Sequence, residues 1–405
     1  FLDDFEGAET PFDLKNVYNW KFAPTPQGQN DLFPESAIDS TRGFKRANLQ
    51  FHSIDQSFST SNNNSKFVPS HLKGTDKSHP FVRAWALKEV FPQLNIQMQE
   101  INNLQTLDLM YYPQKRGIYN YNSSINDFNP DGTFKNPKGS WAGIARKIET
   151  NDFEAANIDY IEFWMMDPFC MNRNTSNKGE LYINIGNISE DLNADNRRAV
   201  ENGLPVDGST TGLDNTRFGR VAQNSPQIQA FDNNPTSRPF QDKGLDGLND
   251  AEEQDYFKAY LDALKNNFGV GSKIYQSALA DPSNDDYQHY LDPNYDGIEK
   301  SILGRYELYN GMEGNSNLKT LSTGVPISAT TLPDDEDINR DQTLNFNEED
   351  FQYKIEISPS AFVVGSNFVT DSIRTIPNYI DPSGQPATVT WYQFKVPIRL
   401  YEKKV

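Results

Sequence analysis

The sequence contains one cysteine in 405 residues, four histidines and no long run of apolar residues. A single thiol excludes an internal disulfide, and with it the small secreted domains that disulfides hold together. No segment approaches the roughly 18 apolar residues that a membrane helix needs. A nucleophile elbow, a phosphate loop and a His-Glu-x-x-His helix are also missing, and the histidines lack metal-site spacing. The motifs therefore favour a protein that is not an enzyme.

Basic residues are too few to balance the acidic ones: 37 Lys and Arg stand against 56 Asp and Glu, a formal charge of −19. Such a chain repels phosphate backbones and anionic lipids, so we exclude nucleic acid as a partner and expect divalent cations. The mean hydropathy is low, at −0.72, but 12% aromatic residues place the chain among folded proteins. Its length predicts two or more packed lobes. Because the first residue is Phe1, we expect an excised or processed piece.

Two neighbouring segments have the period of β-strands. Residues 158–166 carry apolar side chains on both alternating faces, which predicts a strand buried on both sides. Residues 181–186 alternate on one face only and predict a half-buried strand beside the first, in the same sheet. The same period predicts strands over residues 81–87, 104–112, 351–357 and 389–401.

Helical spacing appears over residues 251–268, where Asp250 and Glu253 are placed to cap the helix and Gly269 to end it. A weaker helix is predicted over residues 298–309. We therefore predict a mainly β fold, a jelly-roll-like β-sandwich with helical insertions and long irregular loops. The predicted units are a sandwich core with long loops (1–240), a helical insertion with acidic loops (241–330) and C-terminal strands that complete the sandwich (331–405).

Residues 337–348 have the spacing of a calcium loop. Oxygen-bearing side chains stand at positions 1, 3, 5, 7, 9 and 12, namely Asp337, Asn339, Asp341, Thr343, Asn345 and Glu348. Calcium takes six to eight oxygen ligands, and this spacing points alternate residues inward. Gln342 stands where such loops usually have glycine, and a strand follows in place of a helix, so we predict a structural site. The alternative is a plain acidic loop.

A second loop of the same kind spans residues 242–253. Asp242, Asp246, Asp250 and Glu253 occupy positions 1, 5, 9 and 12, with Gly247 at position 6. They are a second candidate calcium site. The alternative is that Asp250 and Glu253 only cap the helix.

Two side chains raise the question of catalysis. Glu162 lies on an apolar strand and must be paired or protonated if it is buried. It is either an ion-pair partner of Arg146 or the catalytic acid of a glycosidase, with Asp167 or Glu180 as its mate. We favour the ion pair. Cys170 follows the same strand and is interpreted as a small core residue in preference to a nucleophile.

Several blocks of the sequence carry a resemblance to one family. They are Asp4-Phe-Glu-Gly7, Tyr111-Tyr-Pro113, Trp141-Ala-Gly-Ile-Ala-Arg146, residues 150–157, Ile161-Glu-Phe-Trp164, Asp167-Pro-Phe169, Ile188-Ser-Glu-Asp191, Glu201-Asn-Gly-Leu-Pro205, Gly244-Leu-Asp-Gly-Leu248, Ala329-Thr-Thr-Leu-Pro333 and Asp337-Ile-Asn-Arg-Asp341. In these blocks the chain resembles the SprA/Sov family, the outer-membrane translocons of the type IX secretion system of Bacteroidetes. It departs from the family at Ile118, where a proline is expected, and at Leu192-Asn193, where an apolar pair is expected.

The resemblance implies a soluble segment that caps, gates or scaffolds a giant outer-membrane β-barrel pore for protein export. It also implies a role in gliding motility and a location in the outer membrane, with the soluble part at the cell surface or in the pore lumen. The cofactor that we expect, structural calcium, comes from the two acidic loops and not from the resemblance. The implied partners are secreted cargo proteins, a porin-like outer-membrane protein and a periplasmic plug or shuttle protein. The alternative is a carbohydrate-binding jelly-roll module of a cell-surface protein, suggested by Asp3-Asp-Phe-Glu6.

Overall fold

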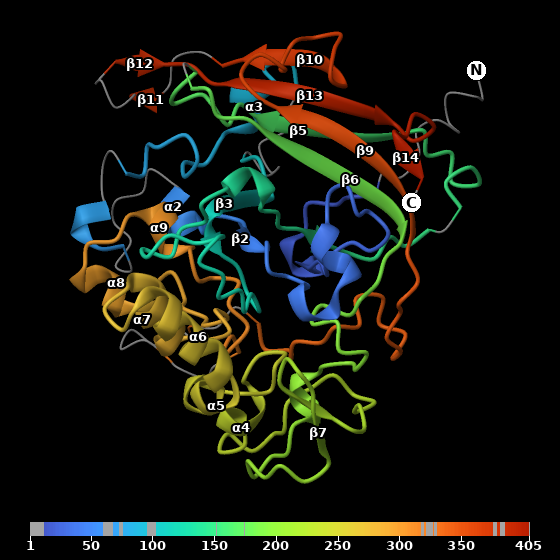
Figure 1. The fold of residues 1–405 in the computed structure, drawn as a ribbon. Helices are drawn as coiled ribbons and strands as arrows, with labels where there is room; N and C mark the ends of the chain where they lie inside the picture. The colour runs from blue at the N-terminus through green and yellow to red at the C-terminus, as the bar shows by residue number, and fades with distance from the viewer. Residues whose placement is uncertain are drawn as a thin grey trace.

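The chain was examined in a computed structural model, which describes residues 12–59, 68–72, 76–94, 103–150, 152–173, 175–316, 320, 327, 330–375, 379–380 and 385–404. Figure 1 shows the long strands of the C-terminal part as a layer at the top, with the helices of residues 238–305 below it. Within the described ranges, no helix is both long and apolar enough to span a membrane.

The upper layer consists of two antiparallel sheets (Figure 1). One contains, in spatial order, β10 (Val369–Arg374), β13 (Thr390–Pro397) and β5 (Tyr160–Met166), and the other β14 (Lys403–Lys404), β9 (Glu349–Ile357) and β6 (Gly179–Asn187). Side chains of both sheets share one core, in which the ring of Phe394 stacks on that of Phe163 with 5.0 Å between centroids. The fold is thus mainly β with strands in small antiparallel sheets. The finer assignment to jelly rolls and the predicted unit boundaries stay predictions.

Strands β5 and β6 do not pair, so the prediction that they are neighbours in one sheet is wrong. β5 pairs with β13 and β6 with β9. β5 is an edge strand on which Tyr160 is 50% exposed, so the prediction of burial on both sides is wrong for its first half. The outer face of its second half is covered, because Trp164 packs edge to face on Phe91 with 5.2 Å between centroids. An apolar pattern on both faces does not distinguish a central strand from an edge strand that a loop covers.

Four two-stranded pairs lie outside the sandwich. They are β1 (Lys21–Phe22) with β4 (Ile144–Ala145), β2 (Ala47–His52) with β3 (Asp108–Arg116), β7 (Leu213–Asn215) with β8 (Arg220–Ala222), and β11 (Tyr379–Ile380) with β12 (Pro386–Ala387). β2 is buried at every position, and its apolar residues Ala47, Leu49 and Phe51 alternate with polar ones. This alternation is a strand signal that the predictions above leave out. β3 begins later than the strand predicted over residues 104–112. The strand predicted over residues 81–87 is wrong, because turns and α3 (Leu87–Val90) occupy that region.

The other helices are short. They are α2 (Gln56–Ser59), α4 (Arg238–Gln241), α5 (Asp250–Tyr256), α6 (Lys258–Phe268), α7 (Lys273–Ala280), α8 (Pro293–Gly297) and α9 (Ile302–Arg305). The helix predicted over residues 251–268 is broken at Phe257, where ψ is 24°, and the helix predicted over 298–309 is reduced to α9. Gly269 ends α6 as predicted, with φ at 85°.

The N-terminal cap of α5 lies one residue earlier than predicted. The Asn249 side chain accepts a hydrogen bond from the main-chain N–H of Glu252, and the Glu252 carboxylate accepts one from the main-chain N–H of Asn249. The prediction that Asp250 and Glu253 form this cap is therefore wrong. Both carboxylates are left available for another role.

His52 is fully buried on β2, and its ring stacks on that of Tyr306 with 4.3 Å between centroids. Neither ring nitrogen has a hydrogen-bond partner. Burial lowers the pKa of His52 from 6.5 to about 3. The folded protein therefore holds this histidine neutral, whereas the unfolded chain binds a proton below pH 6.5.

We predict that His52→Phe removes an acid-dependent loss of stability. Because the pKa is lower in the folded state, the wild type loses about 1.4 kcal/mol per pH unit below pH 6.5, or about 3 kcal/mol at pH 4.5. Phenylalanine keeps the stacking and binds no proton. Urea denaturation of both proteins should show the variant gaining about 3 kcal/mol over the wild type between pH 7 and pH 4.5. A difference that stays constant across this range would contradict the prediction.

Candidate metal centre

Seven carboxylates from three segments come together around the start of α5. They are Asp246, Asp250 and Glu253 on and before α5, Asp281, Asp285 and Asp286 after α7, and Glu313. The main chain joins the last two segments, because the N–H of Glu313 donates to the carbonyl of Asp285 at 2.9 Å. Helices α6 and α7 pack on each other within one apolar core, which brings the residues before α6 and after α7 to the same place.

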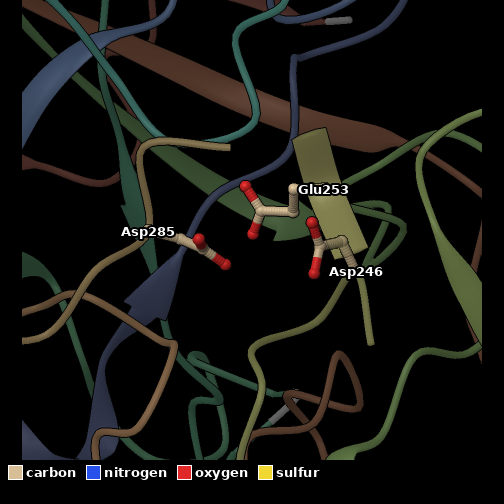
Figure 2. A group of neighbouring side chains, drawn as sticks. All are labelled: Asp246, Glu253 and Asp285. Carbon is tan, nitrogen blue, oxygen red and sulfur yellow. The ribbon is translucent and has the colours of Figure 1, made fainter. Parts of the chain in front are cut away.

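The carboxylates form three groups, in each of which one oxygen per residue lies within 4.8 Å of the others. The groups are Asp246, Glu253 and Asp285; Asp250, Glu253 and Asp281; and Asp250, Asp286 and Glu313. Figure 2 shows the first group, with the three carboxylates turned toward one another. Glu253 and Asp250 each belong to two groups, so the three groups form a continuous row.

Hydrogen bonds hold every carboxylate in the first group. Asp246 accepts from the hydroxyl of Ser283 at 2.6 Å and, through its other oxygen, from the N–H of Leu248 at 3.0 Å. Glu253 accepts from the N–H of Ser283 at 2.8 Å. Asp285 accepts from the hydroxyl of Tyr119 at 2.9 Å. The Oε1 atom of Glu253 and the Oδ1 atom of Asp285 are buried and have no hydrogen-bond partner. Each of these two side chains is thus fixed by one oxygen and offers the other.

Burial dominates the electrostatics of the cluster. Burial, together with the charges of neighbouring carboxylates, raises the pKa of Asp246 to about 7, of Glu253 to about 10 and of Glu313 to about 9. Two basic residues near α5, Lys243 and Arg220, pair with Glu252 outside the cluster. The charge of Arg116 acts on Asp281, where it lowers the pKa against the larger effect of burial. At neutral pH these carboxyl groups hold protons unless a positive charge compensates them.

Two glycines allow the main chain to approach the cluster closely. Gly244 has φ at 75°, and a side-chain carbon there would collide with the carboxylate of Asp285. A side-chain carbon at Gly311 would collide with the main-chain carbonyl of Asp286. Larger residues at either position would push apart the segments that carry the carboxylates.

The structure brings together Asp246, Asp250 and Glu253 of the second predicted calcium loop but not Asp242. The Asp242 carboxylate accepts a hydrogen bond from the hydroxyl of Ser316 at 2.9 Å, outside the three groups. Sequence reasoning missed the four carboxylates of the other two segments. The Asp281-Pro-Ser-Asn-Asp-Asp286 block offered a signal, since it repeats the alternate-residue spacing of oxygen ligands.

The first predicted calcium loop, residues 337–348, is held by other contacts. Asp337 accepts from the main-chain N–H groups of Asp341 and Gln342, and Gln342 adopts the φ of 68° that glycine usually supplies in such loops. Arg198 lies 3.2 Å from Asp337. Glu348 accepts from the N–H of Gln27 at 2.5 Å, outside the loop.

The loop's remaining candidates bond locally or to Glu190. Asn339 accepts from the N–H of Asp341, Asp341 from Thr343, and the amide of Asn345 donates to Glu190. Within the described residues, the loop's carboxylates are not among the groups that meet within 4.8 Å. Calcium binding by this loop stays a prediction.

Two carboxylates join the loop to an earlier part of the chain in a reciprocal clasp. Glu190 accepts from the N–H groups of Ile338, Asn339 and Asn345, at 3.0, 3.0 and 3.1 Å. Glu336 accepts from those of Leu192, Asn193 and Ala199, at 2.9, 3.3 and 2.8 Å. Each segment thus sends one carboxylate into the main chain of the other. We call these two carboxylates the reciprocal clasp.

The predicted pairing of Glu162 with Arg146 is wrong. Glu162 is exposed and lies 3.3 Å from Lys395 on β13, while Arg146 lies 3.5 Å from Glu149. Glu162 faces Lys395 because the two residues are register partners in the sheet. The structural ion pair is present, with a partner that the sequence order did not suggest.

The other candidates for catalysis have partners of their own. Asp167 lies 3.2 Å from Arg173, and Glu180 lies 2.5 Å from Lys354. Cys170 packs in an apolar cluster, and burial raises the pKa of its thiol to about 12. This is the environment of a core residue and not of a reactive thiolate. The Asp3-to-Glu6 stretch, which suggested a carbohydrate-binding module, lies outside the described residues.

Comparison with known families gives the class of the protein. Residues 259–405 match the model of a family described as motility related/secretion protein, SprA_N. These residues include four carboxylates of the cluster, the loop of residues 337–348 and all C-terminal strands of the sandwich. This match confirms, for residues 259–405, the resemblance to the SprA/Sov family seen in the sequence. No curated protein matches the chain.

Proposed function

We propose that this chain is a cap or scaffold segment of the outer-membrane protein-export pore of the type IX secretion system and supports gliding motility. The observation that carries the proposal is the match of residues 259–405 to a family of motility and secretion proteins. The resembling blocks from Asp4 to Arg146 extend the likeness over the rest of the chain.

The architecture supports a scaffold. Distant segments are tied together by buried carboxylates that accept main-chain N–H groups, as in the reciprocal clasp. Such ties fix the course of long irregular segments, which is what a surface that contacts other proteins needs. We propose that the chain is not an enzyme, since Glu253 and Asp285, whose pKa values are strongly raised by burial, are fully buried and out of reach of a substrate.

The proposed partners follow from the same family. They are secreted cargo proteins, a porin-like protein of the outer membrane and a periplasmic plug or shuttle protein. The proposed location is the outer membrane, with this segment at the cell surface or in the lumen of the pore. We also propose structural calcium, bound by the acidic loops.

The proposal predicts that export fails when this segment is replaced in the parent gene. In a Bacteroidetes strain that carries the gene, the codons for residues 12–404 would be exchanged for a flexible linker. We expect type IX cargo to accumulate inside the cells and colonies to stop spreading. The measurements are the cargo in the medium and the amount of parent protein in the outer membrane.

A strain with Lys258→Ala serves as a matched control, because Lys258 is exposed on α6 and pairs with Asp262, which is also exposed. It should export normally. Loss of export with the parent protein still in the outer membrane supports a cap, and loss of both supports a scaffold. Normal export by the linker strain would overturn the proposal.

One observation favours the alternative of a carbohydrate-binding module. The sandwich exposes aromatic rings, among them Tyr160 and Tyr401, and sugars stack on such rings. A glycan array probed with the purified chain decides between the two functions. Binding of a defined glycan that Tyr160→Ala or Tyr401→Ala abolishes would favour the module.

A further inference from the structure

We propose that the seven carboxylates form a buried centre for two divalent cations, with calcium as the best-fitting ion. Asp246, Glu253 and Asp285 hold the first cation, and Asp250, Asp286 and Glu313 hold the second. The centre replaces the single site predicted within residues 242–253 by one that three segments share. The choice of calcium rests on the calcium binding proposed above. The existence of a two-cation centre does not depend on whether the chain serves an export pore.

The unpartnered oxygens are the first argument. Glu253 and Asp285 expose 0% of their surface, yet each has one carboxylate oxygen without a hydrogen-bond donor. Burying an unpaired carboxylate is costly, so such groups are paired or bind a metal. Both side chains belong to the same group within 4.8 Å and are turned toward each other (Figure 2). A cation between them would satisfy both free oxygens at once.

The same condition recurs in the second group. The Oδ1 atom of Asp250 and the Oε2 atom of Glu313 are also buried without a hydrogen-bond partner. Both belong to the group that Asp286 completes. Two groups that share no residue thus each contain buried carboxylate oxygens without a hydrogen-bond partner. A single ion could not bind the oxygens of both groups.

The middle group does not add a third cation. It shares Glu253 with the first group and Asp250 with the second, and its remaining member is Asp281. Asp281 accepts from the N–H groups of Asp285 and Asp286, at 3.2 and 3.4 Å, and is not among the residues with an unpartnered buried oxygen. Asp281 is a positioning residue that orients the segment carrying one ligand of each cation.

The ligands select the ion. The groups contain carboxylate oxygens only, without the nitrogen or sulfur that zinc and copper prefer. Calcium binds oxygen at about 2.3 to 2.6 Å, so two of its ligands lie at most about 5.2 Å apart, and the oxygens of each group lie within 4.8 Å of one another. Magnesium draws its ligands closer and keeps several waters, which a fully buried first group does not favour.

The test counts ions in the purified chain. Protein stripped with chelator and dialysed against calcium would be analysed by native mass spectrometry and by elemental analysis. We expect two calcium ions from this centre. Asp285→Asn and Glu313→Gln, which keep the side-chain shape, should each lose one ion, and the double variant both. Asp341→Ala is the matched control in the loop of residues 337–348: any third ion that depends on it belongs to that loop.

Terbium luminescence gives a second readout on folded protein. Tyr119 donates to Asp285 and should transfer energy to terbium in the first site, so Tyr119→Phe should lower tyrosine-excited emission severalfold while the ion count stays at two. Calcium should displace the terbium. A count of zero or one, or a count that neither substitution changes, would overturn the two-ion centre. Magnesium retained in preference to calcium would overturn the choice of ion. Neither result bears on export.

Discussion

Phe394→Ala should destabilise the chain by about 3 to 5 kcal/mol, as large-to-small changes of buried phenylalanine do. Phe394 is fully buried in the middle of β13, stacks on Phe163 of β5 and meets Phe362 edge to face with 5.7 Å between centroids. Removal of its ring leaves a cavity between the two sheets of the sandwich. The expected loss is a large part of a typical stability of about 5 to 15 kcal/mol. Urea denaturation followed by tryptophan fluorescence measures it.

The matched control is Phe346→Ala. Phe346 has the same side chain but is 45% exposed, so its truncation should cost less than about 1 kcal/mol. Similar midpoints for the two variants would mean that the sheets do not share the core described here.

Glu336→Ala should cost about 3 to 5 kcal/mol, the other large effect that we expect. The change leaves the N–H groups of Leu192, Asn193 and Ala199 without an acceptor. Each buried donor left unpaired costs about 1 to 3 kcal/mol, and water that enters the gap recovers part of the sum. Glu336→Gln keeps one acceptor oxygen and the volume, so about half of this loss is expected.

Glu402→Ala is the control for the clasp, because Glu402 is exposed and should change stability by less than about 0.5 kcal/mol. Denaturation midpoints of the three variants would be compared under the same conditions. If Glu336→Ala has the same denaturation midpoint as Glu402→Ala, the reciprocal clasp does not hold the two segments together.

Local patterns were sufficient to predict part of the fold. The alternation in residues 351–357 and 389–401 predicted β9 and β13, because a half-buried strand shows its period without knowledge of its partner. Gly269 ends α6 because glycine adopts positive φ without strain. Partners were harder to predict. The pairing of β5 with β13 joins segments more than 200 residues apart, and no local signal points to it.

The candidate metal centre was predictable only by half, for the same reason. Asp246, Asp250 and Glu253 stand in one loop with ligand spacing, whereas Asp285 and Glu313 reach the cluster through the packing of α6 and α7. Asp242 has the correct spacing and still lies elsewhere, because its carboxylate bonds to Ser316. The alternation in β2 indicates a strand, but the burial of its polar face could not be predicted, because Asn48, Gln50 and His52 look like surface residues in a sequence.

The reciprocal clasp has a consequence for how the chain reaches its native state. The bond from Ile338 to Glu190 closes a stretch of 148 residues, and β6 cannot pair until β9 has been made. Contacts between such distant residues cost loop-closure entropy before they return any energy, which slows folding. Synthesis starts at the N-terminal end, so β6 stays unpaired until β9, in the last third of the chain, has been made. During that time its unfinished sheet edge is open to wrong partners, including other copies of itself.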